Sequence, residues 1–321
     1  MSVLVTGAAG FIGYHTCEAL LARGEAVTGI DCLNDYYDVR LKQARLDRLA
    51  RHHGFRFLKC DFSDREAMLA LENEDFSHIV HLGAQPGVRY SLVNPFAYVT
   101  ANVMGQVVML ELARRLKRLQ NLVYASSSSV YGGNDKFPFA VGDPVETPQS
   151  LYAATKRSDE LIAHTYAHLY ALPLVGLRFF TVYGPWGRPD MAPFLFTQAM
   201  LKGEEITVFN NGEMWRDFTY IDDIVAGILA ALAKPPSDKP PHKVYNLGNN
   251  KSEKLTDFIA AIEAALGIKA KMRFAPMQPG DVVTTYADIA ETQRELGFAP
   301  TTPIAVGVPK FVAWYRNFYK V

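Results

Sequence analysis

The sequence has few of the features that stabilise small or secreted folds. Its three cysteines, Cys17, Cys32 and Cys60, are odd in number and form no C-x-x-C pair, which argues against a disulfide framework and a cysteine zinc site. We therefore expect buried thiols in a reducing compartment, and hence a cytoplasmic protein. No charged leader precedes Val3 and no run of about eighteen apolar residues occurs, so neither secretion nor a membrane span is expected.

The chain also lacks an excess of charge, because 33 basic residues balance 33 acidic ones. A general nucleic-acid binder would be basic, so we expect no nucleic-acid partner. His164 and His168 would share one helix face without a third ligand, and no other histidines show zinc spacing with an acid, so no metal is expected. What the chain does have is length and apolarity, with 321 residues of which 49% are hydrophobic, enough to bury a large core.

Short apolar runs alternate with longer segments of helical period along the first half of the chain. This pattern is typical of parallel strands joined by crossover helices, and it predicts an α/β fold with a doubly wound, parallel Rossmann sheet. A helix is expected over residues 11–23. The expected strands cover residues 3–5, 26–30, 55–58, 78–82, 122–125 and 174–177.

A smaller second domain is expected to begin after Arg178, where closely spaced prolines interrupt the alternation. A predicted helix over 222–233 and a strand over 244–247 would return the chain to the sheet, so the second domain would be discontinuous. The expected division assigns residues 1–178 and about 218–248 to the Rossmann domain, and about 179–217 and 249–321 to a substrate domain.

The strongest local motif is the glycine turn of Gly7, Gly10 and Gly13, which follows the first strand and opens a helix. Backbone can approach a pyrophosphate closely there, although such a turn alone could be a tight connection only. Asp31 ends the second strand eighteen residues after Gly13, where a carboxylate can accept both ribose hydroxyls and would repel a 2′-phosphate. The order of strand, turn, helix and acid therefore predicts NAD rather than NADP.

Two further strand ends fit the same site. Asp61 and Phe62 follow the third strand, and Leu82, Gly83 and Ala84 follow the fourth. Ligands bind outside the carboxyl ends of parallel strands, which favours a cofactor role for both segments. Asp61 could equally cap the following helix.

Tyr152 and Lys156 are four residues apart in a segment of helical composition, so their side chains would project from one face. A tyrosine with an ordinary pKa of about 10 is a poor base, but a neighbouring ammonium and a positive nicotinamide favour the phenolate and lower that pKa. Such a tyrosine can take a proton from an alcohol while hydride leaves its carbon. The Y-x-x-x-K spacing alone decides little, because it is expected about once by chance.

A run of serines, Ser126 to Ser129, follows the fifth strand and precedes Val130, Tyr131 and Gly132. Serine runs are more often polar loops. At the carboxyl edge of the sheet, however, a hydroxyl is needed to orient a reacting alcohol, so the position favours a role in catalysis.

Together, the glycine turn, the serine run and Y-x-x-x-K resemble the extended short-chain dehydrogenase/reductases that act on nucleotide sugars, over nearly the whole chain. The resemblance implies that Tyr152 is the acid/base, Lys156 its partner and ribose ligand, and Ser127 the hydroxyl that contacts the sugar oxygen. It implies NAD contacts from Gly7, Gly10, Phe11, Ile12, Gly13, Asp31, Asn34, Asp61, Phe62, Leu82, Gly83, Ala84, Asn102, Tyr152, Lys156, Phe179 and Val182.

The serine run also discriminates between reactions within that family. Nucleotide-sugar 4,6-dehydratases resemble this chain but carry Asp-Glu where Ser128 and Ser129 stand, and UDP-glucuronate decarboxylases carry a glutamate at the place of Ser129. Neither carboxylate is present. Oxidation followed by hydride return to the opposite face, an epimerisation, is therefore expected.

Two segments, residues 86–91 and 184–190, look like those of UDP-glucuronate 4-epimerases rather than UDP-galactose epimerases. By this resemblance Arg188 and Thr181, with Ser127, Ser128 and Ser129, would hold the C5 carboxylate away from the geometry that favours decarboxylation. Arg89 could contact the carboxylate or a phosphate, or form a surface ion pair.

The nucleotide end of the substrate is expected near the C-terminal part of the chain. Arg216 resembles the family arginine that meets the diphosphate, with pairing to Asp217 or Asp222 as the alternative. Asp222 and Asp223 are expected to cap a helix. Further contacts to the nucleoside are expected from Thr207, Val208, Phe209 and the segment Pro279, Gly280 and Asp281.

The leading hypothesis is NAD-dependent 4-epimerisation of UDP-glucuronate to UDP-galacturonate. The alternatives are a 4-epimerase for another UDP-hexose, a UDP-glucuronate decarboxylase, and an NAD-binding regulatory protein on the same fold. The apolar helices expected at 99–116 and 150–168 permit a homodimer, which is common in the family.

Overall fold

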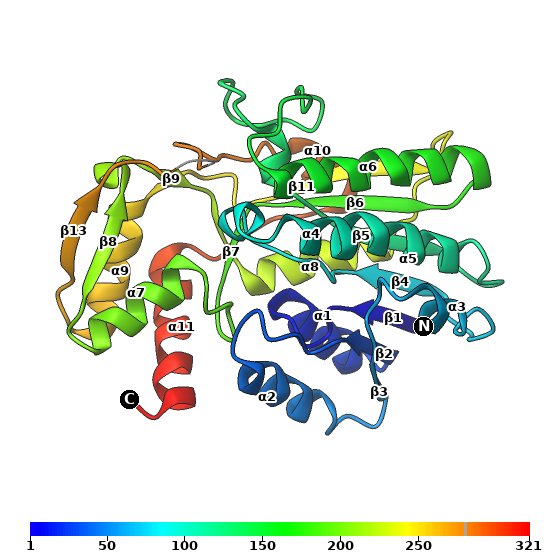
Figure 1. Ribbon diagram of the computed structural model, residues 1–321, viewed down its shortest axis with the longest axis horizontal. Helices are drawn as coiled ribbons and strands as arrows, with labels where there is room; N and C mark the ends of the chain where they lie inside the picture. Colours follow the sequence, from blue (N-terminus) through cyan, green and yellow to red (C-terminus); the bar gives the residue numbers. More distant parts are fainter. Residues whose placement is uncertain (279–280) are drawn as a thin grey trace.

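The computed structural model describes residues 1–278 and 281–321. Its centre is a seven-stranded sheet in the order β11-β6-β5-β4-β1-β2-β3, with every neighbouring pair parallel (Figure 1). The predicted α/β Rossmann sheet is confirmed. The strands are β1 (Ser2–Thr6), β2 (Ala26–Asp31), β3 (Phe55–Lys59), β4 (His78–His81), β5 (Asn121–Ser127), β6 (Leu174–Phe179) and β11 (His242–Leu247).

Both faces of this sheet are buried, which explains its apolar strands. On β1, Val3 and Val5 belong to one apolar cluster and Leu4 to another, and none of the three is exposed. Alternation of side chains along the strand places the two clusters on opposite faces of the sheet. A strand covered on both sides must be apolar throughout, as residues 3–5 are.

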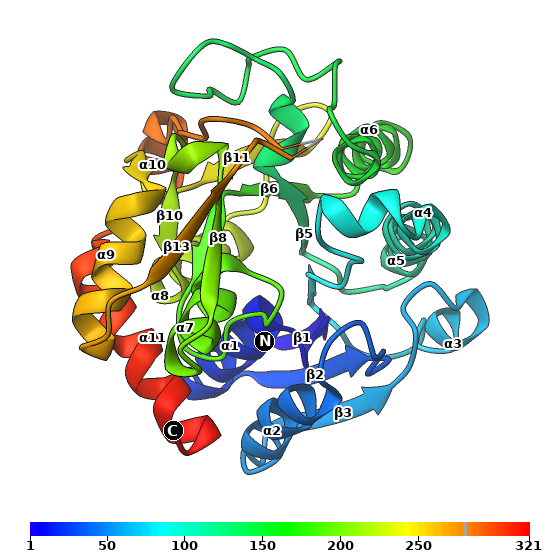
Figure 2. The same ribbon diagram turned by 60° about the vertical axis from the view of Figure 1, so that its left-hand side comes forward.

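Helices cover the two faces separately (Figures 1 and 2). One group, on the side of the first apolar cluster, is α1 (Phe11–Ala22), α2 (Val39–Leu49) and α8 (Ile221–Leu232). The other is α3 (Arg65–Leu69), α4 (Pro95–Tyr98), the π-helix η2 (Val99–Met104), α5 (Gly105–Ala113) and α6 (Leu151–Tyr170). Two short 3-10 helices, η1 (Arg89–Leu92) and η3 (Ser128–Tyr131), follow β4 and β5.

The structure corrects one expected helix. Residues 99–116 do not form a single α-helix, because the segment begins as the π-helix η2 and α5 ends at Ala113. The wider turn contains Asn102, whose side chain binds the chain after β4, and π-turns often occur at such functional positions. Residues 95–113 are long and apolar enough to cross a membrane by length and composition alone, but half of this stretch is buried, as in a core helix.

The remaining elements lie mostly beyond the carboxyl edge of the sheet (Figure 1). β8 (Glu205–Phe209) pairs with β13 (Lys271–Ala275), β9 (Trp215–Arg216) with β12 (Glu253–Lys254), and β7 (Thr181–Tyr183) with β10 (Phe218–Tyr220). The helices here are η4 (Asn210–Gly212), α7 (Ala192–Leu201), α9 (Leu255–Leu266) and α11 (Ile304–Tyr319). A further helix, α10 (Ala290–Leu296), contacts α8 and β11. The division into a Rossmann and a discontinuous substrate domain stays a proposal.

The cysteines form no disulfide, but only Cys17 is fully buried. Cys32 and Cys60 are half-buried because they follow β2 and β3 at the edge of the sheet, where the strands emerge from the core. The expectation of three buried thiols is therefore wrong for these two.

Candidate active site

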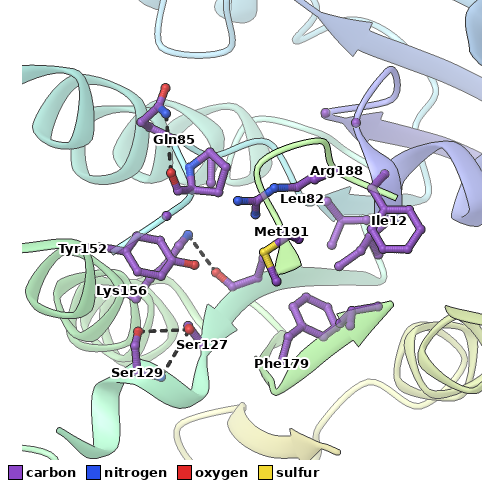
Figure 3. A pocket seen from close by; sticks show the side chains of 18 of the residues that line it. Ile12, Leu82, Gln85, Ser127, Ser129, Tyr152, Lys156, Phe179, Arg188 and Met191 are labelled. Carbon is purple, nitrogen blue, oxygen red and sulfur yellow. Dashed lines mark hydrogen bonds between the residues drawn. The ribbon is translucent and has the colours of Figure 1, made fainter. Parts of the chain in front are cut away.

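A cleft lies at the carboxyl edge of the sheet, between the strand ends and the segments after β6, β9 and β13 (Figure 3). Parallel strands deliver their loops to this edge, which is where α/β proteins bind ligands. Most of the predicted site residues line it. They are Gly7, Gly10, Phe11, Ile12, Gly13, Asp31, Asn34, Phe62, Leu82, Gly83, Ala84, Ser127, Ser128, Ser129, Tyr152, Lys156, Phe179, Thr181, Val182, Arg188, Arg216 and Asp281.

The glycine turn forms a closely packed cradle at one end of the cleft. Gly7 has φ +69°, and a Cβ on Gly13 would lie 2.0 Å from the Gly7 carbonyl oxygen. The helix α1 starts without a side-chain cap at Gly10, so its first amides stay available to a ligand. This backbone geometry fits a pyrophosphate.

Asp31 closes the cradle at the end of β2. It is 8% exposed, and its two oxygens accept from the amides of Leu33 at 2.8 Å and Ala9 at 3.1 Å. The carboxylate therefore sits between the glycine turn and the chain after β2, where the ribose of a dinucleotide is expected. Lys42 also lines the cleft and donates to the backbone and side-chain oxygens of Asn34 at 2.7 and 2.6 Å.

Asp61 and Asn102 do not line the cleft. The exposed Asp61 accepts from the amide and hydroxyl of Ser63, while Asp64 rather than Asp61 caps α3. Asn102 is 1% exposed; its oxygen accepts from the amide of Gln85 at 2.8 Å, and its nitrogen donates to the Thr155 hydroxyl at 2.9 Å. Asn102 thus fixes the chain after β4 against α6, one layer behind the cleft.

Tyr152 and Lys156 point into the cleft from the first turns of α6 (Figure 3). The helix begins there because the Ser150 hydroxyl caps it by accepting from the Ala153 amide at 3.1 Å. Lys156 is 3% exposed, and its Nζ donates to the Ala125 carbonyl at 2.9 Å. The lysine is therefore held between α6 and the end of β5.

The serine run divides between the cleft and the core. Ser127 Oγ accepts from the amide and hydroxyl of Ser129 at 3.2 and 2.9 Å, and both side chains are drawn beside Tyr152 (Figure 3). Ser126 instead donates to the buried Glu160 at 2.6 Å. No Asp or Glu occurs in the run, so its cleft face presents hydroxyls only.

Arg188 reaches the cleft from the opposite side and is paired with an acid. Its Nε and terminal nitrogen donate to the two oxygens of Asp190 at 3.0 and 2.6 Å, and the Tyr36 hydroxyl donates to Asp190 at 3.0 Å. Burial opposes the charge of Arg188, but Asp190 outweighs it and holds the pKa of Arg188 above its usual value. The arginine thus stays a cation at every working pH.

Arg216 is paired with Asp281 at 3.0 Å, not with Asp217 or Asp222 as the alternative supposed. Asp281 also meets Arg89 at 3.5 Å, and the Arg89 guanidinium lies 4.9 Å from the centre of the Phe209 ring. Arg89 is mostly exposed and does not line the cleft. With two arginines on one carboxylate, of which only Arg216 lines the cleft, this cluster carries an excess of positive charge that would favour an anionic ligand.

Asp217 and Asp223, at the start of α8, form hydrogen bonds within the fold and do not pair with Arg216. Asp217 accepts from the amide of Ala287 and the hydroxyl of Thr219 at 3.1 and 3.0 Å, and burial raises its pKa to about 6. Asp223 does not cap α8, because its carboxylate binds the amides of Thr301 and Thr302. The expected helix cap is therefore wrong.

The expected nucleoside segment on β8 lies outside the cleft lining. Val208 is fully buried, and the Thr207 hydroxyl accepts from Arg273 at 2.9 Å. Pro279 and Gly280, also expected there, lie outside the described residues. Several further lining residues were not predicted, among them Tyr36, Tyr37, Lys42 and Gln85, because they lie on loops and on α2 outside any motif.

The comparisons agree with this geometry. A model described as the NAD dependent epimerase/dehydratase family matches residues 3–248. The chain is 53% identical over 336 residues to an uncharacterised 37.6 kDa protein of Escherichia coli O111:H-, with full coverage of both. It is 49% identical over 333 residues to UDP-glucuronate 4-epimerase 4 of Arabidopsis thaliana, covering 99% of this chain and 76% of that protein.

Among solved structures, the UDP-glucuronic acid 4-epimerase from Bacillus cereus in complex with UDP-glucuronic acid and NAD is similar to this chain. The TM-score is 0.92 at 35% sequence identity, and the match covers 99% of this chain and 100% of that one. The similarity therefore spans both the sheet and the elements beyond its carboxyl edge.

Proposed function

Because the chain belongs to the NAD dependent epimerase/dehydratase family, we propose that it is a UDP-glucuronate 4-epimerase that forms UDP-galacturonate. The observation that carries the proposal is the composition of one cleft. It holds the glycine cradle with Asp31, the Tyr152 and Lys156 pair, hydroxyls without a carboxylate at 127–129, and Arg188.

The cradle fits NAD, since only glycine at position 13 leaves room for the close backbone turn and Asp31 suits free ribose hydroxyls. Bound there, NAD supplies the chemistry of accepting a hydride from the sugar carbon and returning it. Tyr152 takes the proton from the C4 hydroxyl and later gives it back. Lys156 favours the phenolate of Tyr152, and Ser127 orients the reacting oxygen.

The other walls of the cleft orient the substrate. Arg188, Thr181 and the hydroxyls of Ser128 and Ser129 hold the C5 carboxylate, and Arg216 meets the diphosphate. A cation and hydroxyls stabilise the negative charge on the carboxylate, which would have to pass to the ketone as carbon dioxide leaves, and they keep the carboxylate away from the geometry that favours this loss. The proposed outcome is therefore epimerisation and not decarboxylation.

The test is incubation of the purified protein with UDP-glucuronate and no added NAD. UDP-galacturonate as the product supports the proposal, whereas a UDP-pentose with carbon dioxide favours the decarboxylase alternative. Absence of turnover favours an NAD-binding regulatory protein. Tyr152→Phe should lower kcat by about 10²–10⁴-fold. Tyr166→Phe is the matched control, because Tyr166 is on the same helix but donates to Glu111.

We also propose a cytoplasmic homodimer. Large apolar side chains remain exposed on and next to η1, α4 and η2, among them Val93 at 76% and Phe96 at 79%, and on α6, where Leu161 is 53% exposed. These elements contact one another, and the proposed interface would bury their exposed side chains together. Contiguous apolar surface of this kind is typical of subunit interfaces.

A further inference from the structure

Two carboxylates stand next to each other on α6, directly behind the Lys156 side chain, and both are buried. Both oxygens of the Glu160 carboxylate have hydrogen-bond donors, and two arginines balance its negative charge. It accepts from Arg178 twice at 2.8 Å, from Arg157 at 3.0 Å and from the Ser126 hydroxyl at 2.6 Å. Burial, which raises the pKa of Glu160, is outweighed by these donors, so its pKa lies below the usual value.

Asp159 has a different environment. It is 1% exposed, and one of its oxygens accepts from Lys156 Nζ at 3.1 Å. The other oxygen has no hydrogen-bond partner among the described residues. Within the part of the chain that the structure describes, the lysine of the proposed catalytic pair is thus the one cation in contact with this carboxylate.

Other titratable groups around Asp159 keep one protonation state near neutral pH. Burial and the Lys156 charge lower the pKa of His81, on β4, to about 3. Burial raises the pKa of Tyr124, on β5, well above its usual value. Arg178, on β6, is bound to Glu160. Burial raises the pKa of Asp159 to about 6 against the opposing charge of Lys156, with Glu160 adding to the rise.

We propose that Asp159 is a positioning residue that sets how much of the Lys156 charge acts on Tyr152. The carboxylate holds the ammonium beside β5 and cancels part of the field that favours the phenolate. The inference rests on the proposed roles of Tyr152 and Lys156 and deepens them. It assigns to Asp159 a function in proton transfer without contact to substrate or cofactor.

The inference makes the activity of the enzyme depend on two coupled titrations. Above about pH 6 the ionised Asp159 restrains the ammonium, and below it the neutral carboxyl releases the full charge toward Tyr152. The stronger positive charge then offsets part of the protonation of the phenolate that falling pH causes, which broadens the acid limb of the kcat profile. Asp159→Asn should abolish this coupling, because the amide is neutral at every pH.

The experiment compares the wild-type protein, Asp159→Asn and Asp143→Asn in the forward reaction across pH. The Tyr152 phenolate is followed in parallel by the ultraviolet difference between each protein and its Tyr152→Phe counterpart. Above about pH 6, where the wild-type Asp159 is ionised, we expect both the acid limb of kcat and the phenolate signal of Asp159→Asn to move about one unit to lower pH. Asp143 is the matched control, a buried aspartate paired with Lys136 outside the cleft, and its variant should match the wild type.

An acid limb and phenolate signal that stay in place, or move to higher pH, in Asp159→Asn would overturn the inference. If the asparagine variant does not fold, Asp159→Ser replaces it with the same expected direction. Failure of the proposed function is separately visible, because the wild-type protein would then form no UDP-galacturonate from UDP-glucuronate. If Tyr152→Phe is inactive but the pH profile of Asp159→Asn matches the wild type, only the proposed role of Asp159 is rejected.

Discussion

The ion pair of Arg188 with Asp190, together with Tyr36, links segments on two sides of the cleft. Asp190 is shared with Tyr36, which lies 154 residues earlier in the chain on the loop after β2. Arg188 is thus held in place by the segment that follows Asp31. A residue on the proposed cofactor side of the cleft orients a group on the proposed substrate side.

Removing Arg188 should therefore affect both rate and product. Charge-assisted hydrogen bonds contribute about 1.5–3 kcal/mol, so Arg188→Ala should lower kcat/KM for UDP-glucuronate by about 10–150-fold. Release of the carboxylate should also raise the share of UDP-pentose among the products, measured by chromatography. Arg40→Ala is the control, because Arg40 forms an exposed pair with Asp38. Unchanged kinetics and products in Arg188→Ala would remove this arginine from the mechanism.

At the scale of elements, the turn between β1 and α1 depends on its third glycine. A Cβ at Gly13 would meet the Gly7 carbonyl oxygen at 2.0 Å, and that contact is backbone, which cannot rotate away. Gly13→Ala should destabilise the fold by about 1–3 kcal/mol and reduce the NAD that copurifies with the protein. Urea unfolding and the absorbance of released cofactor measure the two effects. Gly142→Ala is the control and should leave stability and NAD content unchanged, because a Cβ at Gly142 meets nothing within 4 Å. Equal NAD content in the two variants would contradict the proposal that the glycine turn binds the cofactor.

A second element-scale prediction concerns the tie between β6 and α6. Arg178 donates two hydrogen bonds to buried Glu160, so Arg178→Met should cost up to about 3–5 kcal/mol at pH 7 by leaving Arg157 and Ser126 to compensate that carboxylate. Because the folded-state pKa of Glu160 is depressed, the stability it contributes is present above its unfolded value and is lost as pH falls. The difference between variant and wild type should therefore shrink toward pH 4, as urea unfolding at several pH values would measure. A difference independent of pH would contradict this account.

The same elements explain what the sequence could predict. The glycine turn, Asp31 and the Tyr152–Lys156 pair are local patterns with fixed consequences, since strand, turn and helix geometry place their side chains. The partners of Asp281 could not be predicted, because Arg216 is 65 residues away and Arg89 is 192 residues away. Asn102 was expected beside the cofactor, yet the π-turn directs it to the Gln85 backbone. Side-chain pairing across the fold depends on packing that no local pattern encodes.

At the scale of the whole molecule, the exposed apolar surface over α4, η2 and α6 is the feature that a single chain leaves unexplained. Val93 and Phe96 are more than three-quarters exposed, whereas most large apolar side chains of the chain are buried in its core. Self-association through a two-fold axis would bury the same surface of both subunits at once. The cleft opens at the carboxyl edge of the sheet, so the reaction would proceed in each subunit.

If the chain dimerises as proposed, Phe96→Glu should make it a monomer, because pairing two subunits would then bury an unpaired charge from each. Sedimentation velocity at micromolar protein is the measurement, with turnover of UDP-glucuronate as the check on folding. Leu195→Glu is the matched control, since Leu195 on α7 is 45% exposed but lies away from this surface. A wild-type protein that sediments as a monomer, or a Phe96→Glu variant that stays dimeric, would show that another surface or none joins the subunits.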